Sequence, residues 1–127
     1  MGWHKSNSFW VPGVPVPMPH GENYRNKWAF QQHRVVGWKT LVGYYAKINA
    51  APEWPLARQV PVALSFAFHL ARNAGDLKNL IWSTEDALAK IVFANDAQVV
   101  CYLPPTTKQK ATPCGCQITV WWEACTP

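Results

Sequence analysis

Residues 75–102, GDLKNLIWSTEDALAKIVFANDAQVVCY, decide the fold of this chain. The first part repeats apolar residues at spacings of three and four, which predicts an amphipathic helix after Asp76. Residues 94–96 form a turn signal, and residues 97–102 are β-branched and aromatic enough to predict a short strand. Asp76 and Asp96 therefore bracket one helix. If the strand folds back along that helix, we expect both carboxylates to face one pocket.

The flanking sequence predicts the other elements of one sheet-and-helix domain. Residues 9–19 alternate proline with valine and methionine, which is typical of an extended edge segment. Residues 31–50 predict a helix, residues 60–70 a strand, and residues 117–122 a last strand. Along residues 60–70 large apolar side chains alternate with small ones, and the small face would let a helix pack closely. We expect residues 104–113 to form a mobile loop or hairpin tip.

The predicted order of elements defines the fold class. It is α+β, with a mixed sheet and helices packed mainly on one face. Residues 1–127 form a single domain, in which we expect residues 1–8 to be a flexible N-terminus. A chain of 127 residues with 49% hydrophobic and 15% charged residues is long and apolar enough for a real core.

Composition also limits the function. Eight Trp are too many to hide in one small interior, which favours an aromatic surface or an oligomer interface. A formal net charge of +5 permits a polyanionic partner. No run of eighteen apolar residues is present, and the N-terminal ten residues lack the apolar core of a signal peptide, so we expect a cytoplasmic protein without a membrane span.

The stretch at residues 75–102 resembles the signature of the RusA-like Holliday-junction resolvases, D-x-D-N-L-x-K-x-x-x-D-A-L followed by D-D-x-Q-V-V. The N-terminal V-x-G-x-P-V-P pattern of that family is similar to residues 11–17. The matching positions are Asp76, Asn79, Leu80, Asp86, Ala87, Leu88, Asp96, Gln98, Val99 and Val100. The resemblance implies a RusA-like fold, a homodimer, four-way DNA junctions as substrate, and cleavage that depends on Mg²⁺, with Mn²⁺ as the other candidate ion.

The resemblance also implies roles for particular residues. Asp76 and Asp96 take the places of metal-binding aspartates, and with Lys78 they form the expected catalytic set. Asn79 and Asp86 are supporting residues: Asn79 at the start of the helix would cap or pin a backbone group, and Asp86 would pair with the lysine four residues on.

Two positions depart from the family pattern. Lys78 stands where the family has an aspartate, and Trp82 stands where it has a lysine. In one reading Lys78 supplies the positive charge that Trp82 no longer offers. In the other, Lys78 forms a salt bridge with Asp76 or Asp96 and displaces the metal. The alternatives for function are thus an impaired resolvase, an inactive branched-DNA-binding protein on the same fold, and an interaction protein that ignores DNA.

Basic residues outside the motif are candidates for DNA contact. Arg25 and Lys27 lie beside aromatic residues, a mixture suited to phosphate charge and base stacking. Lys108 and Lys110 lie in the expected loop at residues 104–113, where they could close on phosphate. A surface loop with locally packed aromatics is the alternative for residues 20–30.

The four cysteines fit several interpretations. Cys114 and Cys116 form a C-x-C pair, with Cys101 and Cys125 elsewhere. A zinc site and a redox pair remain alternatives, but the spacing differs from a C-x-x-C knuckle. We favour reduced structural thiols.

Overall fold

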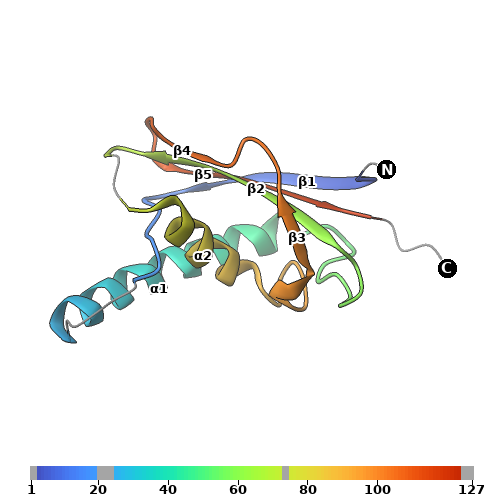
Figure 1. Cartoon of the computed structure of the whole chain (residues 1–127), viewed down its shortest axis with the longest axis horizontal. Coiled ribbons are helices and arrows are strands. Elements are labelled where there is room, and N and C mark those ends of the chain that lie inside the picture. Colours follow the sequence, from blue (N-terminus) through green and yellow to red (C-terminus); the bar gives the residue numbers. More distant parts are fainter. Residues whose placement is uncertain (1–2, 20–24, 73–74, 124–127) are drawn as a thin grey trace.

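A computed structural model describes residues 3–19, 25–72 and 75–123, with side chains in the first helix described from His33 onward. Five strands form one mixed sheet, and two helices form a layer on it. Figure 1 shows this arrangement. In chain order the elements are β1 (Lys5–Pro12), α1 (Arg25–Ile48), β2 (Val62–Leu70), α2 (Leu77–Leu88), the 3₁₀ turn η1 (Asp96–Gln98), β3 (Val99–Tyr102), β4 (Thr107–Lys110) and β5 (Gly115–Trp122).

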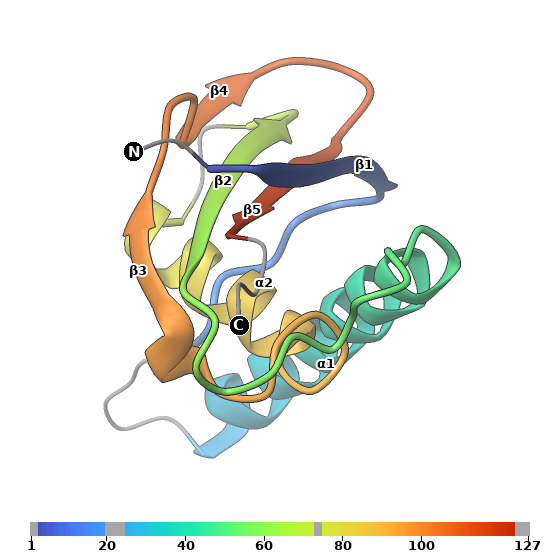
Figure 2. The same cartoon turned by 90° about the vertical axis from the view of Figure 1, so that its right-hand side faces the viewer.

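The sheet has β2 near its centre. Its strand order is β1-β5-β2-β3, with β4 also paired to β2. β5 runs antiparallel to both β1 and β2, whereas β3 and β4 run parallel to β2. β3 pairs with the start of β2 and β4 with its end, so the two short strands follow one another along the same edge (Figure 2). The predicted mixed sheet is confirmed.

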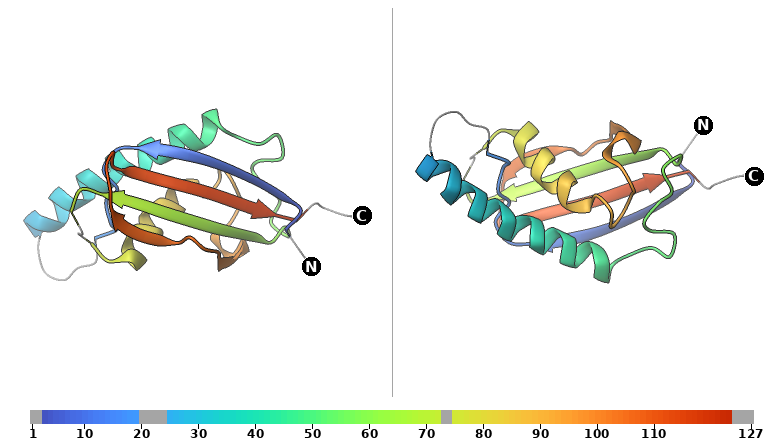
Figure 3. Two further views of the ribbon diagram at one scale, coloured as in Figure 1. Left: turned by 90° about the horizontal axis from the view of Figure 1, so that it is seen from above. Right: turned by 90° about the horizontal axis from the view of Figure 1, so that it is seen from below.

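Both helices cover the same face of this sheet (Figure 3). The core lies between the layers, because inward residues of β1, β2 and β5 meet apolar residues of α1 and α2. Its fully buried members include Val11, Val42, Val62, Leu64, Phe66, Phe68, Leu80, Leu88, Ile118 and Val120. Trp38 of α1 donates a 3.0 Å hydrogen bond from Nε1 to Oγ1 of the buried Thr84, which ties the two helices together.

The opposite face of the sheet carries no helix (Figure 3). The expectation that a helix packs against the small side of β2 is therefore wrong: the large apolar side chains make the core, because they bury more area. Side-chain hydrogen bonds link neighbouring strands on this helix-free side. The hydroxyl oxygens of Ser8 and Thr119 are 3.0 Å apart, and Gln117 donates to Ser8 at 2.6 Å. By strand alternation the described strand residues on this side include no Lys, Arg, Asp or Glu.

Three other expectations need correction. Residues 5–8 of the supposedly flexible N-terminus belong to β1, where backbone pairing with β5 holds them. The segment expected to be a mobile loop contains β4, because its residues find free backbone groups at the end of β2. α1 begins at Arg25, six residues before the predicted helix, while α2 ends at Leu88, before Ile91.

Gly115 is required at the start of β5, where this strand pairs with the end of β1. A Cβ atom there would lie 2.3 Å from a ring atom of Trp10 and 2.5 Å from the carbonyl oxygen of Val11. The second contact is to backbone, which cannot move aside without disturbing the β1–β5 pairing. Gly37 in α1 differs, because a Cβ there would have no neighbour within 4 Å.

Candidate nucleic-acid interface

The first turn of α2 lines an open surface pocket. Asp76 occupies the N-cap position in extended conformation, and its backbone carbonyl accepts hydrogen bonds from the amides of Asn79 and Leu80. Its carboxylate makes no capping bond, so it is free of the commonest structural role at this position. Asp76, Leu77, Lys78 and Asn79 line the pocket.

β4 reaches the residue next to this pocket from the sheet edge. Lys108 donates a 2.6 Å hydrogen bond from Nζ to the carbonyl oxygen of Gly75, next to Asp76. Lys108 is therefore an ordered residue of a strand. Lys110 also lies in β4, and its side chain is exposed. One lysine from β4 and one from α2, Lys78, thus bring positive charge to the start of α2.

The outward side of α2 carries an aromatic residue between charged ones. Lys78 and Trp82 are one turn apart, and Trp82 is 52% exposed. Glu85 follows in the next turn and accepts a hydrogen bond from the hydroxyl of Tyr102 in β3. Burial raises the pKa of Glu85, and the negative charges of Asp96 and Asp86 add to that rise. Burial and the contact with Glu85 raise the pKa of Tyr102 as well.

Asp96 lies at the other end of α2. It opens η1, which is capped by the side chain of Asn95, and its charge acts on Glu85. β3, which follows it, pairs with Val62 at the start of β2, whereas Asp76 comes after the end of β2. Twelve helical residues separate the two ends of α2, about 18 Å at 1.5 Å per residue. Figure 1 shows η1 beside the end of α2, away from its start.

The structure thus does not bring Asp76 and Asp96 into the one pocket that the sequence predicts. The physical reason is the parallel β2–α2–β3 crossover, in which the end of β2 and the start of β3 lie at opposite ends of the sheet along the strand direction. In the described part of the chain, no three His, Cys, Asp or Glu side chains gather into a group that could hold a metal ion. The expected shared magnesium site does not fit this arrangement.

The predicted salt bridge of Lys78 is not formed either. Within residues 3–19, 25–72 and 75–123, the ion pairs are Lys5 with Glu53 and Lys39 with Asp86. Lys78 is exposed and keeps its charge available at the pocket.

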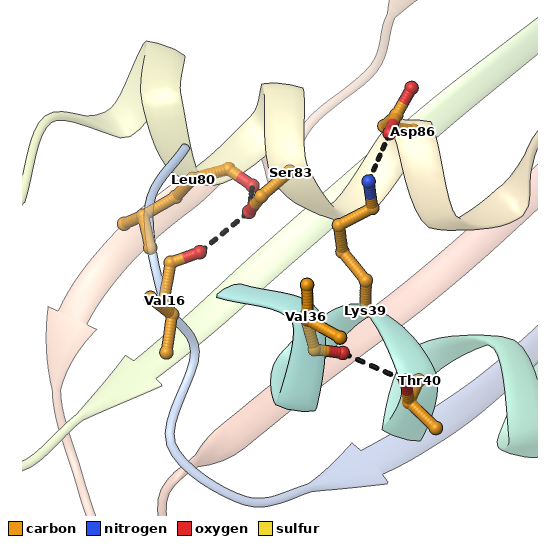
Figure 4. Close-up of polar contacts among 7 residues, drawn as sticks. All are labelled: Val16, Val36, Lys39, Thr40, Leu80, Ser83 and Asp86. Atoms are coloured by element: carbon orange, nitrogen blue, oxygen red, sulfur yellow. Dashed lines mark hydrogen bonds and ion pairs between the residues drawn. The ribbon is translucent and has the colours of Figure 1, made fainter. Parts of the chain in front are cut away.

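The two supporting residues have structural contacts. Asp86 pairs with Lys39 of α1 rather than with Lys90, because α2 ends at Leu88 and the helical spacing is lost (Figure 4). Asn79 accepts a 2.9 Å hydrogen bond on its backbone oxygen from the amide of Met18, so it holds the proline-rich segment through its main chain.

A second bond anchors the same proline-rich segment to α2. Ser83 donates from Oγ to the carbonyl oxygen of Val16 at 2.6 Å (Figure 4). This bond and the one to Asn79 hold residues 13–19 against the helix that carries Lys78 and Trp82.

Gln98 is a structural residue. It is 5% exposed, and its amide oxygen accepts from the amides of Ala94 and Asn95 at 2.8 and 2.9 Å. Its amide nitrogen donates to the carbonyls of Ala57 and Val60 at 2.7 and 3.0 Å. Gln98 therefore joins the turn that carries Asp96 to the loop before β2.

Arg25 and Lys27 lie in the first turn of α1 rather than in a loop, and their side chains are outside the described residues. The sequence interpretation missed Glu85 and Tyr102. Glu85 could have been found, because it follows Lys78 by seven residues, or two helical turns, and so lies on the same side of the predicted helix. Tyr102 could not, because its partner depends on how β3 lies along α2.

Cys101, Cys114 and Cys116 carry free thiols, and Cys125 is outside the described residues.

The fold and surface define a class: an α+β protein that presents a lysine and an exposed aromatic on one helix, with a further lysine from β4 at the start of that helix. The family model described as endodeoxyribonuclease RusA matches residues 12–120, and the chain belongs to this family. Membership in this family supports nuclease activity on branched DNA. Nucleases of the family generally depend on a divalent metal ion. A search of the curated proteins found no match. In the described residues, no helix has the length and apolarity to cross a membrane.

Proposed function

We propose that this protein binds four-way DNA junctions as a RusA-family member, and that its cleavage centre is impaired. The family match over residues 12–120 is the observation that carries the substrate class. We also propose a cytoplasmic location. The basic residues Arg25, Lys27, Lys108 and Lys110 would contact phosphates, and their contribution would weaken as salt rises.

Two features support impairment. Lys78 occupies a position at which the family resemblance requires a carboxylate, beside Asp76 in the same pocket. An ammonium there favours a phosphate oxygen and repels a cation. Asp96, the other expected ligand, lies near Glu85 at the far end of α2. Any cleavage that the protein retains would need Mg²⁺ or Mn²⁺ held mainly by DNA and by Asp76.

We also propose that the protein acts as a homodimer. A junction has two equivalent strands to cut, and a symmetric pair of subunits offers two equivalent surfaces to them. Sedimentation of the protein with and without a junction tests this. Monomers at concentrations that saturate a junction, with one monomer per junction, would contradict it.

The test of function separates binding from cutting. A synthetic four-way junction is titrated with protein at low salt without metal, and cleavage is followed with Mg²⁺ or Mn²⁺. We expect binding that falls with salt and cleavage that is slow. Asp76→Asn should abolish whatever cleavage remains, while Asp86→Asn, an exposed acid paired to α1, should leave it within about twofold.

A gain-of-function variant tests the cause of impairment. Lys78→Asp with Trp82→Lys would place two carboxylates at the pocket and a lysine one turn on. We expect the single-turnover cleavage rate with Mg²⁺, measured at protein concentrations that saturate the junction, to rise by about tenfold or more, since a metal ligand and a charge-stabilising group are each worth several kcal/mol in such sites. Rapid cleavage by the natural sequence would contradict impairment.

The second candidate is a junction-binding protein without nuclease activity, favoured by the absence of a metal-holding group of three among the described residues. It predicts binding without cutting under every metal condition. Failure to bind junctions at low salt would refute both candidates and favour a protein-interaction role.

A further inference from the structure

We propose that Trp82 is a stacking residue for an unpaired or unstacked nucleotide, supported by Lys78 on the phosphate. This inference rests on the proposed function and specifies the part of a branched DNA that the surface recognises: the bases at the point where strands separate.

The first step of the argument is exposure. Trp82 is 52% exposed in the middle of α2, a helix whose inner side is fully buried. An indole of this kind gains by covering its ring, and the fold leaves about half of Trp82 open although it buries Trp38, Trp54 and Trp122. Trp82 is therefore not needed by the core.

The second step is the neighbourhood. Lys78 lies one turn before Trp82 on the same helix and is exposed. Tyr102, 44% exposed, comes from β3 and reaches α2 through its bond to Glu85, three residues after Trp82. The surface thus combines apolar area with an ammonium group, the two features that bind a base and its phosphate.

The third step concerns the occupant. A flat duplex side offers phosphates and sugars but no free base face, so it would use Lys78 and Lys108 without using the indole. A base that has left its stack offers the face that Trp82 can cover. Two acids also lie at this surface: Glu85 shares a hydrogen bond with Tyr102, and the charge of Asp76 is offset by Lys78, which lines the same pocket. The surface therefore suits a strand-exchange point better than a continuous duplex.

The experiment compares Trp82→Ala with Tyr44→Ala. Tyr44 is 58% exposed on α1 near Lys47, so it is an aromatic of similar exposure beside a lysine, at a surface formed with Ala87 and Ile91 near the end of α2. Affinity is measured for a four-way junction and for a duplex of the same arm sequence, without metal. A junction with 2-aminopurine at the branch point reports on stacking through its fluorescence.

We expect Trp82→Ala to weaken junction binding by about 5- to 150-fold, the range that one lost base–aromatic stack gives, and duplex binding by about twofold or less. The 2-aminopurine signal that the natural protein produces should be lost in Trp82→Ala and largely kept in Trp82→Phe. Tyr44→Ala should behave as the natural protein does. Thermal unfolding of each variant checks that the exposed substitutions leave the fold intact.

The outcomes separate the inference from the function on which it rests. If the natural protein binds junctions and Trp82→Ala binds them equally well, the inference fails and the proposed function stands. If Trp82→Ala weakens junction and duplex alike, the indole is not reading an unstacked base and the inference also fails. If the natural protein binds neither DNA, both fail, and the exposed indole becomes a candidate contact for another protein.

Discussion

The hydrogen bonds of Gln98 allow a prediction that tests how the turn carrying Asp96 is held. Replacing Gln98 with Met keeps the side-chain length and removes all four bonds. The amide of Asn95 and the carbonyl of Val60 then lose their partner, whereas the amide of Ala94 still donates to the carbonyl of Leu56 at 3.2 Å and the carbonyl of Ala57 still accepts from the amide of Val60 at 2.9 Å. At about 0.5–1.5 kcal/mol per bond, the free energy of unfolding should fall by roughly 2–6 kcal/mol. That is a large share of the stability of a domain of this size, about 6–19 kcal/mol at 0.05–0.15 kcal/mol per residue.

Urea unfolding at pH 7 measures this loss. Gln109→Met is the matched control, because Gln109 is exposed and its bond at 3.2 Å to His69 is on the surface, so its loss should stay within about 0.5 kcal/mol. A loss for Gln98→Met below about 1 kcal/mol, or equal to that of the control, would refute the reasoning.

Gln98→Glu gives a second test with a definite sign in pH. A carboxylate at this position keeps the two amides but faces two carbonyl oxygens, so burial would raise its pKa in the folded state above the unfolded value of about 4.3. The penalty relative to the natural protein is then present at pH 7 and disappears as the pH falls below that unfolded value. A stability difference that is constant between pH 7 and pH 4 would contradict this account.

Three further outcomes follow from the packing. Thr84→Val leaves the buried indole N–H of Trp38 without its acceptor and should cost about 1–3 kcal/mol in urea unfolding, a cost that largely disappears in a Trp38→Phe background. Gly115→Ala should lower the free energy of unfolding by about 1–3 kcal/mol or more, because its Cβ would meet backbone. Gly37→Ala, in open space on a helix, should raise that free energy by about 0.5–1 kcal/mol. Equal effects of the two substitutions would contradict the packing argument. Glu85→Gln should gain stability over the natural protein as the pH rises above about 4.3, since the raised pKa of Glu85 means that its ionised form destabilises the fold; a gain that appears only at low pH would be the wrong sign.

The sequence predicts most of the fold because each element carries its own periodicity. The large residues of β2 and the apolar stripe of α2 need only local spacing to be recognised, and both are found where they were expected. β4 is different. Its four residues, TKQK, have no apolar pattern, and they become a strand only because the end of β2 offers free backbone groups.

The candidate site was harder to predict for a related reason. Sequence order places Asp76 and Asp96 on either side of one helix, but their separation depends on the direction in which β3 returns. A parallel return carries Asp96 away from Asp76 and toward Glu85. The pairing of Asp86 with Lys39 likewise depends on how α1 crosses α2, which no local spacing encodes.

The bare side of the sheet affects how the protein would meet a polyanion. Every described Lys on a strand, at positions 5, 108 and 110, projects toward the helical layer, and the other side holds hydroxyls, amides and aromatic rings. A molecule with a net charge of +5 thus carries its electric field asymmetrically. Under the proposed function, a DNA polyanion would be attracted to the helical side of the molecule more than to the bare side.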